Sequence, residues 1–130
     1  MEGKKLIFVV DDDPFILNLV SKRLVIEGYQ VKSFSYGEEC VSSLSLKPDL
    51  IILDYLFYHK EQTKVMDGKV IFSLIQQFDV SIPVIILSGQ EDGAIVLELA
   101  RLGIEDYVIK DEDLIENLLE IVKGILDVAE

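Results

Sequence analysis

Five polar residues in this sequence are candidates for a functional site. Each of them comes just after a short apolar run. They are Asp11, Asp12, Asp54, Ser88 and Lys110. Carboxylate oxygens are preferred ligands of hard divalent cations, a hydroxyl group can donate to a phosphate oxygen, and a lysine can pair with it as a point charge. A carboxylate can also act as a nucleophile toward phosphorus. Brought together, these groups would suit metal-assisted phosphoryl transfer.

The elements that must position these residues alternate along the chain. Strands are predicted at 6–10, 30–35, 50–53, 84–87 and 107–109, and helices at 14–27, 38–46, 68–78, 95–102 and 111–130. Apolar strands alternating with helices predict an α/β fold, with a five-stranded parallel sheet covered on both faces. Right-handed crossovers then bring the carboxyl end of every strand to one edge, where ligands bind in such folds.

Asp54 is the carboxylate that is hardest to explain as an ordinary loop residue. It follows four large apolar residues, where an unpaired charge would cost several kcal/mol. Asp11 and Asp12 could each be a loop or cap residue, and Asp13 is best explained as the N-cap of the helix that begins at Pro14. Three carboxylates at one edge would repel each other unless a cation lies among them. A site with few oxygen ligands suits Mg²⁺ better than Ca²⁺.

Lys110 and Ser88 would complete such a site. Taken alone, Lys110 would be a surface lysine and Ser88 a turn residue before Gly89. At an edge that also holds carboxylates, the lysine can contact a phosphate or Asp54, and the serine hydroxyl can hydrogen-bond a phosphoryl oxygen. With Asp54 as nucleophile, the set predicts in-line phosphoryl transfer with charge neutralised on the phosphoryl oxygens.

Composition narrows the class of protein. The 130 residues include 24 acidic and 12 basic side chains, and the net charge of −12 disfavours nucleic acid and anionic membranes as partners. Cys40 is the only cysteine, which excludes an intrachain disulfide and favours a reducing compartment. No apolar run approaches the length of a membrane span, and no signal-peptide pattern is present. One domain over residues 1–130, in the cytoplasm, is expected.

Four motifs, in order, resemble the receiver domain of two-component response regulators. They are Phe8-Val-Val-Asp-Asp-Asp-Pro14, Pro48-Asp-Leu-Ile-Ile-Leu-Asp54, Ile85-Ile-Leu-Ser-Gly89 and Asp106-Tyr-Val-Ile-Lys110. The resemblance covers essentially the whole chain and implies a flavodoxin-like (βα)5 fold with strand order 2-1-3-4-5. It also implies that Asp54 is phosphorylated, and that Asp11, Asp12, Asp54 and the backbone carbonyl of Leu56 bind Mg²⁺. The implied switch hydroxyl, phosphate-contacting lysine and inward-moving aromatic are Ser88, Lys110 and Tyr107, respectively.

The resemblance further implies partners. A sensor histidine kinase or a phosphotransfer protein would donate the phosphoryl group, and a downstream effector protein or domain would receive the signal. The interaction face would comprise the fourth helix, fifth strand and fifth helix, through which a homodimer could also form. The chain would not be an enzyme beyond its own phosphotransfer and dephosphorylation.

Several departures from the family pattern bear on these expectations. Asp111 follows Lys110 where a proline is common, and Gly89 stands where alanine is usual. The segment between Asp54 and Gly68 is longer than usual. No effector domain follows the last helix, which fits either a stand-alone regulator or an excised domain.

Two other functions remain open. A receiver-like interaction module could have abandoned phosphorylation, although all five edge residues are present. A magnesium-dependent phosphatase that forms an aspartyl-phosphate would use Asp-x-Asp after the first strand, which Asp11–Asp13 formally supply. The companion motifs and the substrate cap of such phosphatases are not apparent.

Overall fold

A computed structural model of the chain describes residues 3–54, 68–89 and 93–127. Its strands are β1 (Leu6–Val10), β2 (Gln30–Phe34), β3 (Leu50–Asp54), β4 (Val84–Ser88) and β5 (Asp106–Ile109). Its helices are α1 (Pro14–Ile26), α2 (Gly37–Ser42), α3 (Gly68–Phe78), α4 (Gly93–Leu102) and α5 (Leu114–Leu126), with a 3₁₀ turn at Leu44–Leu46. The five strands are parallel and lie in the order β2-β1-β3-β4-β5, which confirms the predicted fold class.

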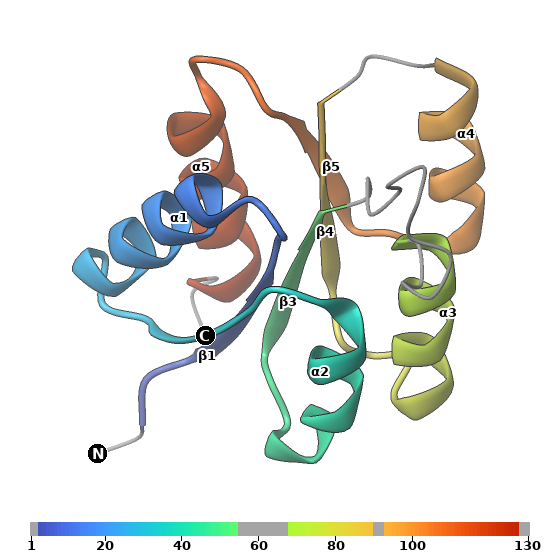
Figure 1. The fold of residues 1–130 in the computed structure, drawn as a ribbon, viewed down its shortest axis with the longest axis horizontal. Coiled ribbons are helices and arrows are strands. Elements are labelled where there is room, and N and C mark those ends of the chain that lie inside the picture. Colours follow the sequence, from blue (N-terminus) through green and yellow to red (C-terminus); the bar gives the residue numbers. More distant parts are fainter. Residues whose placement is uncertain (1–2, 55–67, 90–92, 128–130) are drawn as a thin grey trace.

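The helices cover the sheet on both faces, with α1 and α5 on one side and α2, α3 and α4 on the other (Figure 1). Alternate residues of each central strand supply the two cores. Phe8 and Ile51 belong to the core beneath α2, α3 and α4, whereas Val9 and Ile52 belong to the core beneath α1 and α5. Strands β3 and β4 are buried throughout, as their continuously apolar sequences require. No helix in the described ranges is long and apolar enough to cross a membrane.

The ends of α1 form as the sequence predicts. Asp13 is the N-cap, and its side chain accepts a hydrogen bond of 2.9 Å from the backbone N–H of Phe15. Pro14 occupies the first helical turn, where its missing N–H costs nothing. Gly28 follows the helix with a φ of 103°, a conformation that glycine adopts without steric cost.

The prediction of one α-helix over residues 38–46 is wrong about where the helix ends. The α-helix stops at Ser42, and only a 3₁₀ turn follows before Lys47 adopts a left-handed conformation. Serine side chains compete for backbone hydrogen bonds here, because Ser42 Oγ donates to the carbonyl of Glu38 at 3.1 Å.

The helix predicted at 111–130 begins later and ends earlier, because α5 runs from Leu114 to Leu126 and a turn precedes it, in which Asp111 Oδ1 accepts a hydrogen bond from the N–H of Asp113. Residues 128–130 of that prediction lie outside the described ranges. The remaining predicted elements are confirmed with small differences at their ends. In particular, β3 and β4 include Asp54 and Ser88.

Candidate functional site

The carboxyl ends of β1, β3, β4 and β5 bring the predicted site residues to one edge of the sheet. Asp54 and Ser88 are the last residues of β3 and β4, while Asp11 and Lys110 directly follow β1 and β5. Asp54 pairs in register with Leu87 of β4, so both strands end at nearly the same level. The side chains of Asp11 and Asp54 are almost wholly buried, at 0% and 2% exposure. Two carboxylates thus lie in the interior, where a charge is costly unless a cation or hydrogen bonds compensate it.

Lys110 supplies that compensation by reaching both carboxylates. Its Nζ lies 2.9 Å from Asp11 Oδ2 and 3.2 Å from Asp54 Oδ1. Burial would lower the pKa of Lys110, but the close contact with Asp11 and the charge of Asp54 outweigh it and raise the pKa above its usual value. The lysine is therefore held as a cation. The sequence predicted the contact with Asp54, whereas the contact with Asp11 was missed because its reach across the sheet has no local sequence signal.

Asp12 completes a compact group of three carboxylates. One carboxylate oxygen from each of Asp11, Asp12 and Asp54 lies within 4.8 Å of the others. Asp11 Oδ1 accepts a hydrogen bond of 2.9 Å from the backbone N–H of Asp13, which fixes the orientation of the carboxylate. Its Oδ2 is fully buried and lies 2.9 Å from Lys110 Nζ, its ion-pair partner. Three carboxylate oxygens this close together, two of them from buried side chains, fit the ligand preference of Mg²⁺.

Backbone hydrogen bonds fix the loops that carry these side chains. The N–H of Lys110 donates to the carbonyl of Ser88 at 2.8 Å, and the N–H of Asp11 donates to the carbonyl of Phe34 at 3.1 Å. The first bond ties the end of β5 to the end of β4, so the position of Lys110 depends on that of Ser88. The peptide bond between Lys110 and Asp111 is trans.

The predicted switch residues, Ser88 and Tyr107, belong to the neighbouring strands β4 and β5. Ser88 is buried at the end of β4, and Tyr107 is half-buried in β5, where it packs against the core beneath α2, α3 and α4. The carbonyl of Leu56, like the rest of the long segment between Asp54 and Gly68, lies outside the described residues. The structure thus brings together Asp11, Asp12, Asp54 and Lys110 and places Ser88 at the same edge.

Comparison with known proteins identifies the class to which this arrangement belongs. Residues 7–123 match the family model described as the response regulator receiver domain. The uncharacterized transcriptional regulatory protein YbdJ of Bacillus subtilis is 34% identical over 119 residues, which are 92% of this chain and 49% of that protein. The chain spans less than half the length of the curated relatives compared with it.

Solved structures agree with the family match. The beryllofluoride-activated receiver domain of DrrB, from Thermotoga maritima, is 31% identical with a TM-score of 0.78, over 95% of this chain and 98% of that one. A CheY-like receiver domain protein from Methanospirillum hungatei shares the fold, with 23% identity and a TM-score of 0.83 over 96% of this chain and 95% of that one.

The chain belongs to the response regulator receiver domain family. It is a phosphoacceptor receiver of two-component signalling, and the family binds Mg²⁺ at an acidic cluster of the kind seen here.

Proposed function

We propose that Asp54 is the residue that accepts the phosphoryl group. The observation that carries this proposal is the contact of one lysine with two buried carboxylates, of which Asp54 ends a central strand. An oxygen of the Asp54 carboxylate attacks phosphorus in line with the bond that breaks. With phosphohistidine as donor, the P–N bond breaks and the imidazole nitrogen keeps the electron pair. The product is an acyl phosphate on Asp54, which water later hydrolyses to inorganic phosphate and the free carboxylate.

Lys110 and Ser88 stabilise the phosphorylated form. The ammonium group of Lys110 is already 3.2 Å from Asp54 Oδ1, so it can pair with the oxygens that the phosphoryl group adds there. The hydroxyl of Ser88, at the end of the neighbouring strand, donates a hydrogen bond to one of those oxygens. Neutralising these charges at the moment of transfer is the main way in which such sites accelerate phosphoryl transfer.

Asp11, Asp12 and Asp54 are the proposed side-chain ligands of Mg²⁺, with the carbonyl of Leu56 as a further ligand. When bound, the ion would supply positive charge to the phosphoryl oxygens. Asp12→Ala should abolish most Mg²⁺ binding, measured by calorimetry, and most of the phosphorylation. Unchanged Mg²⁺ affinity in this variant would contradict the assignment.

Acetyl phosphate with Mg²⁺ tests the acceptor directly. The wild-type chain should gain a labile adduct of about 80 Da, one HPO₃ unit, in intact mass spectra. Asp54→Asn keeps the size and most of the hydrogen bonding of the side chain but removes the nucleophile, so it should fold and show no adduct. An adduct of equal yield on Asp13 or Ser88 would show that another residue accepts the group. Steady release of phosphate with many turnovers would instead support a phosphatase.

The signal is proposed to leave through α4, β5 and α5. Because the N–H of Lys110 donates to the carbonyl of Ser88, movement of Ser88 toward the phosphoryl group is coupled to the end of β5. That movement of Ser88 would vacate space behind β4, and the half-buried side chain of Tyr107 would rotate into this space. The charge of the phosphoryl group would thereby shift the equilibrium between two packing arrangements of Ser88 and Tyr107. NMR shifts confined to the metal site on adding beryllofluoride, without changes in this face, would contradict the proposal.

Receiver domains act together with histidine kinases and effectors. For this chain we propose a sensor histidine kinase or phosphotransfer protein as donor and an effector protein or domain as target. The face formed by α4, β5 and α5 is the proposed dimer contact. Residues 1–130 act as one receiver domain in the cytoplasm, with no enzymatic activity beyond self-catalysed phosphotransfer and dephosphorylation.

A further inference from the structure

The outer edge of β2 is open to another strand. Within the described ranges, β2 pairs only with β1. The N–H of Gln30 donates to the carbonyl of Lys5, and the carbonyl of Phe34 accepts from Asp11, so these residues turn their peptide groups toward β1. Because peptide groups alternate in direction along a parallel strand, those of Val31 and Ser33 point away from the sheet. A free row of this kind is a template for pairing with an added strand.

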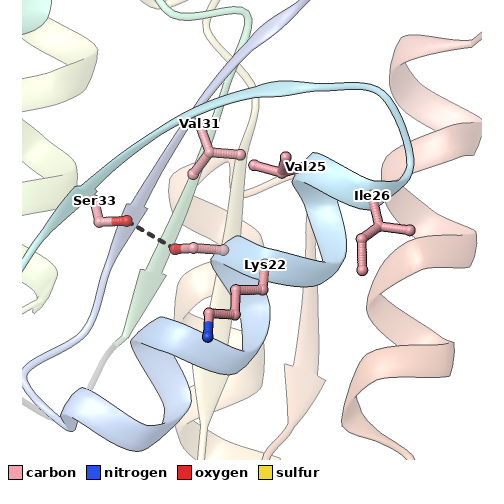
Figure 2. A pocket seen from close by; sticks show the side chains of 6 residues that line it. Lys22, Val25, Ile26, Val31 and Ser33 are labelled. Carbon is pink, nitrogen blue, oxygen red and sulfur yellow. Dashed lines mark hydrogen bonds between the residues drawn. The ribbon is translucent and has the colours of Figure 1, made fainter.

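An apolar groove of about 420 Å³ runs beside this edge, between β2 and α1 (Figure 2). Its lining consists of Ser21, Lys22, Val25, Ile26, Val31 and Ser33. Val25 and Ile26 are 54% and 72% exposed, so α1 leaves apolar surface facing solvent here. Ser21 Oγ lies 2.7 Å from Ser33 Oγ, which links the helix to the edge strand. Side chains from a strand added to β2 would have an apolar surface to cover.

Positive charge gathers around the same strand. A second hollow, which shares Val31 with the groove, is lined in part by Lys4, Lys32 and Lys47. With Lys22 in the groove, four of the 12 basic residues of the chain surround β2. All four are exposed, and none forms an ion pair within the described part of the chain.

One acidic residue, Asp49, lines these hollows beside the lysines, and its charge offsets that of one lysine. Asp49 accepts a hydrogen bond of 2.8 Å from the backbone N–H of Leu6. The chain as a whole carries a net charge of −12, whereas the linings of the two hollows hold four lysines and one carboxylate. This local excess of basic side chains favours an acidic partner at this surface.

We propose that β2 and the adjoining groove bind an extended acidic segment of a partner protein by strand addition. The peptide groups of Val31 and Ser33 pair with the segment, alternate apolar side chains of the segment lie against the groove, and acidic side chains pair with the lysines. A second copy docking through the same edge would place lysines opposite lysines, which is unfavourable. The surface contains no residue of the carboxylate site, so the proposal stands independently of phosphorylation at Asp54.

A fluorescent decapeptide of alternating valine and glutamate tests this proposal on the whole chain. Anisotropy should report binding that weakens with added salt, and hydrogen exchange should slow at the amides of Val31 and Ser33. A decapeptide of alternating valine and lysine should not bind. Asp54→Asn should bind the acidic peptide with unchanged affinity, which separates this surface from the phosphorylation site.

Charge reversal supplies the matched comparison. Lys32→Glu should weaken binding of the acidic peptide about fivefold, the upper range for one exposed pair. Arg101→Glu makes the same change of charge at an exposed position near the end of α4 and should leave the affinity within about twofold of wild type. Equal losses in both variants, binding without protection at Val31 and Ser33, no binding of the acidic peptide, or tighter binding of a DNA duplex would each overturn the proposal.

Discussion

Replacing Lys110 by methionine should destabilise the folded state by about 3 kcal/mol in metal-free buffer. The substitution keeps an apolar stem but removes the cation that lies 2.9 Å and 3.2 Å from Asp11 and Asp54. Breaking a fully buried ion pair costs about 3–5 kcal/mol, because the remaining charge has lost its water and gained no partner. The two carboxylates are 0% and 2% exposed, but the lysine side chain is 18% exposed, so we expect the lower end of that range.

Urea unfolding in the presence of a chelator measures this free energy of unfolding. Lys69→Met is the matched control, because Lys69 pairs with Glu98 on the surface and both side chains are about half-exposed. That control should lose less than about 1 kcal/mol. In an Asp11→Asn background Lys110→Met removes the cation from one buried carboxylate instead of two, so it should cost less there than in wild type. A loss no larger than that of Lys69→Met would show that water solvates the carboxylates in the folded state and would refute the reasoning.

Two further predictions concern packing and pH. A Cβ on Gly37 would lie 2.4 Å and 2.5 Å from Cγ1 and Cδ1 of Ile71, so Gly37→Ala should lower the free energy of unfolding by about 1–3 kcal/mol in urea. Gly124→Ala in α5 has open space and should raise it by about 0.5–1 kcal/mol; equal effects would contradict the packing argument. Burial and the hydrogen bond to Asp127 raise the pKa of Tyr29 from 10 to about 12. The raised pKa stabilises the folded state below pH 10, and this stabilisation is lost as pH rises toward 12. Tyr29→Phe should therefore flatten the fall in the free energy of unfolding above pH 10. An unchanged slope of this free energy against pH would contradict the prediction.

The sequence alone determined the scaffold and the placement of the site. Its apolar runs and helical periodicities are local patterns, and parallel topology sends the end of every strand to one edge. Asp54 and Lys110 could therefore be placed near each other although they are far apart in the chain. The N-cap at Asp13 could be predicted because its hydrogen bond to the N–H of Phe15 is local.

Tertiary structure decided which side chains compensate one another. The contact of Lys110 with Asp11 joins the ends of β5 and β1, and its existence depends on side-chain reach and burial that no sequence pattern encodes. The same is true of the lysine cluster around β2, formed by Lys4, Lys22, Lys32 and Lys47, which no sequence pattern encodes. These lysines come from different segments, and each alone is an ordinary surface residue. Electrostatic environment is a property of neighbours in space, so only the folded chain could show where charge concentrates.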